Sequence, residues 1–280
     1  MFTKIASVVS LFTFCFPAQI VEVSDTPLRR VIKDLGGWPV TDPTWDPDQA
    51  PQLELMMAVI KRNFTLGVLV EEWVGPDDRN SQKHIIQIGT RKCITFFLFV
   101  SIIPDFPFSD QLQLGLPSRD YFLDEESDRD LTAYHNYMTE VSHLLGANES
   151  HAAEELWEVV QFERQLAKIS VPEVIRIDTS AIYHKISIAE LTKQVPQIDW
   201  MLYFSELVSP MHINDTEAIV SYSTSFFVDL GQLLAKTDKR VIHNYIIWRL
   251  VMDLMPHMPP QYEKTRAEFR RVLLGVLTDR

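Results

Sequence analysis

The stretch Leu114-Gly115-Leu116-Pro117-Ser118-Arg119-Asp120-Tyr121-Phe122 mixes residue types that no regular helix or strand combines. Its glycine and proline disfavour a helix, a charged Ser-Arg-Asp follows, and two aromatic residues end the segment. We therefore expect a loop with one fixed conformation. Arg119 has two open interpretations: a salt bridge that holds the loop to a nearby carboxylate, or an arginine exposed to solvent.

Helical periodicity follows this loop. Apolar residues recur three and four positions apart over residues 131–145, and Gly146 is placed to end that helix. Ser187 and Glu190 form the pattern of a capping box, which predicts the start of another helix. Residues 241–254 are apolar on nearly every side, which is typical of a helix at the centre of a core. Further helices are predicted over residues 27–35, 51–64, 152–169, 200–208, 224–235 and 262–277.

A hairpin is expected between the first helices and the loop. Residues 68–74 and 83–88 are short runs rich in β-branched side chains, and Gly75-Pro76-Asp77-Asp78 between them is a turn signal. We expect the two runs to pair as a hairpin with a long loop. The fold class predicted for the chain is mainly α, a helical array with a small β-hairpin.

The length, net charge and cysteine count of the chain argue against several classes of function. The 280 residues are long enough to bury a sizeable core, with 46% hydrophobic and 23% charged residues. The net charge of −12 argues against nucleic acid as a partner. Cys15 and Cys93 are too few for a disulfide framework and do not form a Cys-x-x-Cys pair, so neither is expected to bind zinc or carry out redox chemistry.

The N-terminus and three sequons suggest a secretory route. Residues 1–20 form an apolar leader that is either signal-like or an artefact of the gene model, and its apolar run is shorter than the roughly 20 residues that span a bilayer. Asn63, Asn148 and Asn214 each begin an Asn-x-Ser/Thr triplet and are candidate N-glycosylation sites. We expect an extracellular or plasma-membrane ectodomain.

The loop at 114–122 closely resembles a segment of the neprilysin and endothelin-converting-enzyme family of zinc metallopeptidases. Other segments resemble the same family in the same order: the Gly-Trp-Pro-Val of 35–40, the acidic Asn-Ser turn of 74–81, and the segments 162–169, 183–186 and 244–249. The resemblance runs from about Val21 to the end of the chain. It implies a mostly helical ectodomain in two lobes around an internal cavity, with zinc on one lobe. Residues 21–280 would correspond to the N-terminal region of that ectodomain, before the catalytic helix.

Enzymes of this family require His-Glu-x-x-His on a helix, where two histidines bind zinc and the glutamate activates water. None of the eight histidines begins this motif, and the nearest imitation, His151 to Glu155, lacks its second histidine. His143 and His151 flank a turn and are expected to be polar surface, and His243 is expected to be a core histidine with a hydrogen-bond partner. We therefore assign no catalytic, cofactor-binding or metal-binding residue to this chain, and zinc is expected only in the intact family member.

An atypical insert lies at residues 89–109, where family members pass directly from the second hairpin strand to an Asp-Gln like Asp110-Gln111. The insert is very apolar and aromatic. One interpretation is an added buried strand, and the other, which we prefer, is an intron translated in frame. A transcript that never skips these codons would contradict the second interpretation.

Two functions follow from this sequence. The first is the N-terminal, non-catalytic portion of a neprilysin-like zinc metalloendopeptidase, a family that cleaves extracellular peptides. On this hypothesis the chain is inactive alone, its partner is a missing C-terminal catalytic portion, and peptide substrates belong to the intact enzyme. The alternative is a secreted, catalytically dead relative that acts as a peptide- or protein-binding module.

Overall fold

The computed structural model describes residues 24–89, 114–124, 127–170 and 182–274. The apolar leader expected at 1–20 lies outside these residues, as does all of the 89–109 insert except Gly89. The described chain is mainly α with one small mixed sheet, which confirms the predicted fold class. The helices are α3 (Thr26–Asp34), η2 (Pro39–Thr41), α4 (Leu53–Phe64), α5 (Asp120–Leu123), α6 (Asp128–Leu144), α7 (Glu149–Ile169), α9 (Ile188–Gln194), α10 (Trp200–Leu207), α11 (Thr224–Lys236), α12 (Lys239–Leu254), η6 (Met255–His257) and α13 (Pro260–Leu274). The strands are β1 (Glu71–Asp77), β2 (Asn80–Gly89), β3 (His184–Ser187) and β4 (Ala218–Ser221).

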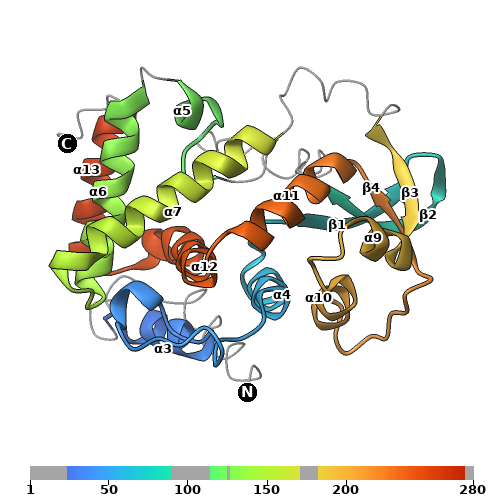
Figure 1. Ribbon diagram of the computed structural model, residues 1–280, viewed down its shortest axis with the longest axis horizontal. Coiled ribbons are helices and arrows are strands. Elements are labelled where there is room, and N and C mark those ends of the chain that lie inside the picture. The colour runs from blue at the N-terminus through green and yellow to red at the C-terminus, as the bar shows by residue number, and fades with distance from the viewer. Residues whose placement is uncertain (1–23, 90–113, 125–126, 171–181, 275–280) are drawn as a thin grey trace.

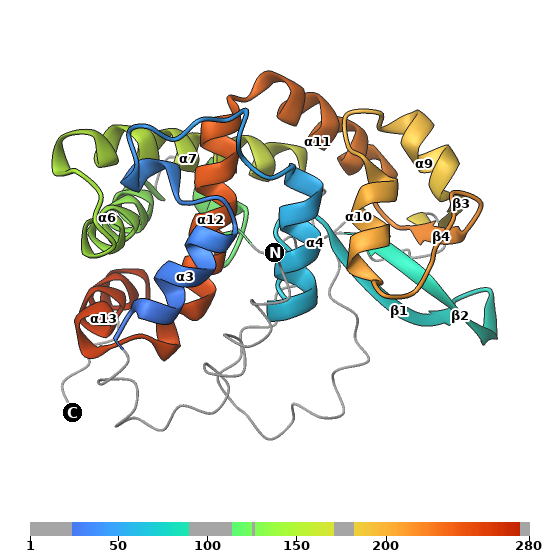
Figure 2. The same ribbon diagram turned by 90° about the horizontal axis from the view of Figure 1, so that it is seen from below.

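One group of helices lies on the opposite side of the molecule from the sheet. Helices α3, α6, α12 and α13 gather on one side in Figure 1, and the sheet lies on the other side with α9 and α10 beside it. The long helix α7 packs on α6 and α12 and also touches α5 and α11. Helix α4 lies between the two sides, where it contacts both α12 and α10 (Figure 2). The two sides therefore share one continuous set of packed helices.

Helix α12 lies at the centre of the core, as its all-round apolar sequence predicts. Every residue from Ile242 to Val251 is buried. Trp248 takes part in this packing, because its indole stacks on Trp38 and also meets the rings of Tyr134 and Tyr137. Aromatic side chains bury large apolar areas, so this cluster supplies much of the driving force that joins α12, α6 and the segment after α3.

Two predicted helix ends, the start at Ser187 and the end at Gly146, are confirmed by the backbone. Ser187 precedes α9 as its N-cap, its hydroxyl accepts from the Glu190 amide at 3.1 Å, and the Glu190 carboxylate accepts from the Ser187 amide at 2.8 Å. Gly146 follows α6 with φ of +104°, a conformation that glycine adopts without steric cost. Local sequence signals therefore located these two boundaries correctly, whereas α7, α12 and α13 begin two or three residues earlier than predicted.

The sheet differs from the predicted hairpin. Its strand order is β1-β2-β4-β3, in which β1–β2 and β3–β4 are antiparallel and β2–β4 is parallel. The predicted long loop is wrong, because β1 continues to Asp77 and β2 begins at Asn80. Pro76 is tolerated inside β1 because β1 is an edge strand, where a missing N–H costs no ladder bond, and the register shifts directly after it. Strands β3 and β4 were not predicted at all.

Candidate functional site

The loop at 114–122 rests on a buried carboxylate of α7. The Gly115 amide donates to Glu163 Oε1 at 2.7 Å, and both residues are buried. A Cβ atom on Gly115 would lie 1.8 Å from the hydroxyl oxygen of Tyr134 in α6. Glycine is therefore required here by the close approach of the loop backbone to a ring, and no positive φ is involved.

Arg249 of α12 belongs to the same group of side chains. We call this group, Glu163, Tyr134 and Arg249, the seat of the loop. Arg249 Nη1 lies 3.6 Å from Glu163 Oε1, and both side chains are almost fully excluded from solvent. Trp248 donates to the Tyr134 hydroxyl at 2.6 Å beside this pair. Burial raises the pKa of Glu163, while the Arg249 charge acts in the opposite direction. These contacts join α6, α7 and α12, and losing one charge of the Glu163–Arg249 pair would leave the other buried without its opposite charge.

Arg119 holds the loop in a different way from the predicted salt bridge. Its guanidinium donates to the backbone carbonyl of Ser170, directly after the last residue of α7, and the side chain is half-buried. Arg164 of α7 donates in turn to the Phe122 carbonyl at 2.9 Å. The final carbonyls of a helix lack partners within the helix, so a guanidinium beside Ser170 satisfies one of them. The carboxylate partner expected for Arg119 is replaced by this carbonyl.

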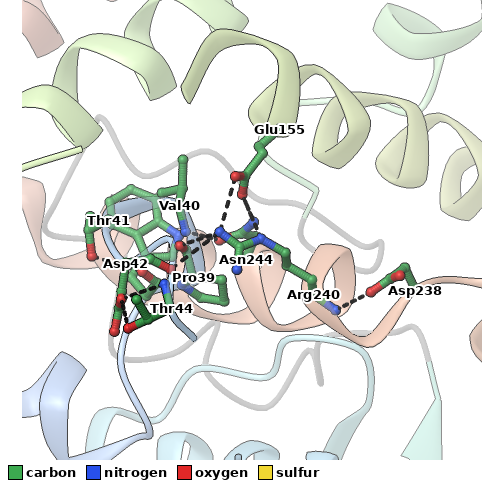
Figure 3. Close-up of polar contacts among 10 residues, drawn as sticks. Pro39, Val40, Thr41, Asp42, Thr44, Glu155, Asp238, Arg240 and Asn244 are labelled. Carbon is green, nitrogen blue, oxygen red and sulfur yellow. Dashed lines mark hydrogen bonds and ion pairs between the residues drawn. The ribbon is translucent and has the colours of Figure 1, made fainter. Parts of the chain in front are cut away.

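The Gly-Trp-Pro-Val segment is held by a second network, drawn in Figure 3. Arg240 of α12 donates to both carboxylate oxygens of Glu155 in α7, each at 3.0 Å, and to the Pro39 carbonyl at 2.7 Å. The Asn244 side-chain oxygen accepts from the Val40 amide at 2.9 Å. Glu155, part of the nearest imitation of a zinc motif, therefore serves as a structural ion-pair partner.

A cluster of charged side chains joins α4, β1 and α10. Lys61 Nζ lies 2.7 Å from Glu71 Oε2 and 3.4 Å from Glu72 Oε1, and Tyr203 donates to Glu72 Oε2 at 2.5 Å. Burial raises the pKa of Glu72 to about 7, and the nearby Lys61 only partly opposes this. A carboxyl group with such a pKa can exchange a proton near neutrality, but Glu72 is 7% exposed and its contacts are with the protein interior.

The tip of the hairpin is tied to the neighbouring strand. Asp77 accepts from the Tyr183 hydroxyl and from Lys185 Nζ, each at 2.7 Å, and its other bond, from the Arg79 amide, closes the short turn. Lys185 is the main cause that lowers the pKa of Asp77 to about 2. The Arg79 guanidinium lies over the Tyr183 ring at 4.3 Å. The segments 74–81 and 183–186 thus meet in space.

The histidines do not converge. His243 is buried, its Nε2 lies 3.0 Å from the Gly37 carbonyl, and burial lowers its pKa to about 4, which confirms a core histidine with a partner. His135 contacts the Ala153 carbonyl through Nε2 at 2.7 Å, and His151 is exposed on α7. Within the described residues no three histidine, cysteine or acidic side chains lie close enough to hold a metal ion. No catalytic step is assigned to these histidines.

The sequons lie in three settings: Asn63 in the last turn of α4, Asn148 directly before α7, and Asn214 in the loop before β4.

Sequence reasoning missed the cluster around Glu72, although a signal was present. Glu71 and Glu72 interrupt a run that is otherwise apolar and β-branched, and carboxylates in such a run require partners if it is buried. Lys61 and Tyr203 could not be named as those partners from the sequence.

Comparisons with known proteins agree with this architecture. The chain is 31% identical over 259 residues to endothelin-converting enzyme 1 of Bos taurus and 30% identical to that of Homo sapiens. The match covers 92% of this chain but only 31% of the bovine enzyme. The chain thus spans about a third of the length of the curated relatives it matches.

Solved structures show the same fold. The zinc metalloprotease Zmp1 of Mycobacterium tuberculosis matches with TM-scores of 0.67 in an open state and 0.68 in an inhibitor complex, at 18% identity. These alignments cover 99% and 97% of this chain and 41% and 35% of the two Zmp1 chains. A family model described as peptidase family M13 matches residues 104–280, which include the loop at 114–122. From its loop, its fold and these matches, the chain belongs to peptidase family M13.

Proposed function

We propose that this chain is the N-terminal, non-catalytic portion of a neprilysin-like zinc metalloendopeptidase, and that the intact protein cleaves extracellular peptides. The observation that carries the proposal is the seating of the loop at 114–122 on Glu163 and Arg249, because this loop is the most specific segment that the chain shares with the family. The relatives named endothelin-converting enzyme and zinc metalloprotease support the same class of chemistry.

The networks in the described residues support a framework role. Charged groups that could take part in chemistry are committed to holding elements together: Glu155 binds Arg240, Glu163 faces Arg249, and Glu72 binds Tyr203. Of these side chains Glu72 and Glu163 are buried, whereas Glu155 and Arg240 are half-buried between α7 and α12. We infer that the chain forms a structural framework against which a catalytic portion packs, and that zinc is held by residues of that portion.

A secretory location belongs to the same proposal. It is supported by the sequons and by the relatives, since peptides outside the cell are the substrates that the family resemblance implies. No helix among the described residues has the length and apolar character needed to cross a membrane. We propose an ectodomain that works on the extracellular side.

The test is a zinc and activity measurement on the purified chain. Zinc content is measured by plasma mass spectrometry after dialysis against zinc chloride, and cleavage of a fluorogenic peptide is followed with and without a chelator. We expect less than stoichiometric zinc and no chelator-sensitive cleavage from a chain that shows a cooperative unfolding transition. Stoichiometric zinc with chelator-sensitive turnover would overturn the non-catalytic assignment.

A second measurement separates this proposal from the binding-module alternative. The transcript is sequenced beyond the codon for Arg280. Codons for His-Glu-x-x-His in the same reading frame further downstream would support the peptidase. A stop codon in every transcript, together with retention of a peptide by the purified chain, would instead favour a binding protein.

A further inference from the structure

We propose that Asn214 is an N-glycan acceptor of this protein and that Asn63, although it begins an equally valid sequon, is not. The inference concerns a modification and not catalysis, and it rests on the proposed secretory route only for its occurrence in the cell. It begins from the different surroundings that the fold gives to two identical sequence patterns.

The side-chain amide nitrogen of Asn63 is buried by the fold. Asn63 lies in the last turn of α4, and its side-chain nitrogen is buried from solvent. No hydrogen-bond partner for that nitrogen is found among the described residues. A glycan needs a bond from this nitrogen and an open path for a large sugar, so α4 could not pack as it does with Asn63 glycosylated.

Asn214 lies in the opposite setting. The loop that joins α10 to β4 runs along the outside of the molecule in Figure 1, and Asn214, Asp215 and Thr216 are all exposed. The neighbouring Met211 is 70% exposed, so the approach to this loop is open over several residues. A sugar attached here would extend into solvent and displace no packed element.

The sequon at Asn214 is also held in one conformation. The Thr216 hydroxyl donates to Asn214 Oδ1 at 2.6 Å, and the Thr216 amide donates to the same oxygen at 3.1 Å. The loop backbone is also held by α9, because the Asp215 carbonyl accepts from the Ala189 amide at 2.8 Å. The hydroxyl that defines the sequon is thus brought to the side chain that would be modified, with the loop turned outward.

The reaction would use a lipid-pyrophosphate-linked oligosaccharide as donor. A bond forms between Asn214 Nδ2 and the anomeric carbon of the sugar, and the bond from that carbon to the pyrophosphate oxygen breaks. The amide nitrogen loses one proton, and the lipid pyrophosphate leaves with the bonding electrons. No oxidant or reductant is needed.

The glycan would stand beside the exposed end of the sheet. Strand β3 is an edge of the sheet, and the Asn214 loop leads directly into β4, its pairing partner. Edge strands can pair with other chains, and a bulky polar group next to one obstructs such pairing. The attachment point thus suits a solubilising role.

The test uses the full 280-residue chain behind a cleavable secretion signal, with an acceptor sequon appended after Arg280 to report passage through the secretory pathway. Asn148→Gln is included throughout, so that only two sequons of the chain remain. Glycosylation is read by peptide N-glycosidase treatment and by mass spectrometry of the deglycosylated peptides in heavy-oxygen water.

Two variants are matched to the structure. Asn214→Asp keeps the oxygen that accepts from Thr216 and removes only the nitrogen, so the turn should persist. Thr65→Gly destroys the Asn63 sequon at an exposed position with φ of +60°, which glycine tolerates, and leaves Asn63 itself unchanged. We expect Asn214→Asp to lose one glycan and Thr65→Gly to lose none.

Two results would overturn the proposal: a glycan on Asn63 in secreted, folded protein, or an unmodified Asn214 in molecules whose appended sequon is modified. Because the secretion signal is supplied, both results leave the proposed peptidase function untouched. Failure of that function in the zinc and peptide test would likewise leave the glycan assignment standing.

Discussion

The hydroxyl of Tyr203 in α10 donates a hydrogen bond of 2.5 Å to the carboxylate of Glu72 in β1, and both side chains are buried. Lys61 contacts both Glu72 and the adjacent Glu71, so two carboxylates share one ammonium group. Burial is the main reason why the pKa of Glu72 is higher than that of an ordinary glutamate, and the neighbouring Glu71 charge adds to the effect. The cluster couples the junction of α4, β1 and α10 to pH.

Stability should fall as the pH rises from about 4.5 to about 7. The pKa of Glu72 is about 7 in the folded protein and 4.5 ordinarily, so unfolding releases a proton between these values. The contribution of Glu72 to the free energy of unfolding is full below pH 4.5 and decreases up to about pH 7, by about 3 kcal/mol. Glu72→Gln should remove this dependence, as measured by urea unfolding at several pH values. Tyr203→Phe should steepen it, because the lost hydrogen bond favours the ionised form, and equal pH profiles for Glu72→Gln and the parent would contradict the argument.

Gly115→Ala should destabilise the chain through the loop at 114–122. The new methyl group would lie 1.8 Å from the Tyr134 hydroxyl, so the loop or the ring must move, and overpacking of this kind costs about 1–3 kcal/mol or more. Gly75→Ala is the matched control, because its methyl group would approach no atom closer than 3.4 Å. Thermal unfolding of both variants checks the difference, and an equal effect of the two substitutions would show that the seat of the loop is adaptable.

Glu163 and Arg249 should be strongly coupled. Each substitution removes the opposite charge that faces the other buried side chain, so Glu163→Gln and Arg249→Met should each cost about 3–5 kcal/mol. The double variant has neither charge, and its loss should be clearly smaller than the sum of the two single losses. A double-mutant cycle of unfolding free energies measures this coupling, and simple additivity would argue that the two groups act independently.

Arg240→Lys should lower stability by about 1–2 kcal/mol, since lysine cannot make the paired contact with Glu155 and also reach the Pro39 carbonyl. Lys239→Ala on the preceding position is the control. Lys239 lies 3.8 Å from Asp48, both side chains are mostly exposed, and such pairs contribute little. Hydrogen exchange of the Val40 amide should accelerate in the Arg240 variant alone. Unchanged exchange would contradict the proposed role of this network.

Helices were predictable from the sequence because their signals are local. The repeat of apolar residues over α6 and α7, and the capping residues at Ser187 and Glu190, act within a few positions of the chain. The hairpin was predicted with the wrong loop, because Gly75 and Pro76 resemble a turn in isolation. Pro76 is accommodated in β1 because that strand lies at the edge of the sheet.

By itself the sequence determined the helical class, the order of the helices and the family, which the loop at 114–122 indicated. Tertiary structure decided what holds that loop in place: Glu163 lies 48 positions from Gly115, and Arg249 is farther still along the chain. Strands β3 and β4 were decided in the same way, since four residues have no stable extended form without neighbours. The physical reason is the separation of the interacting residues along the chain. Caps and apolar periodicity act between adjacent turns, whereas buried charges and strand partners meet only after the whole chain has folded.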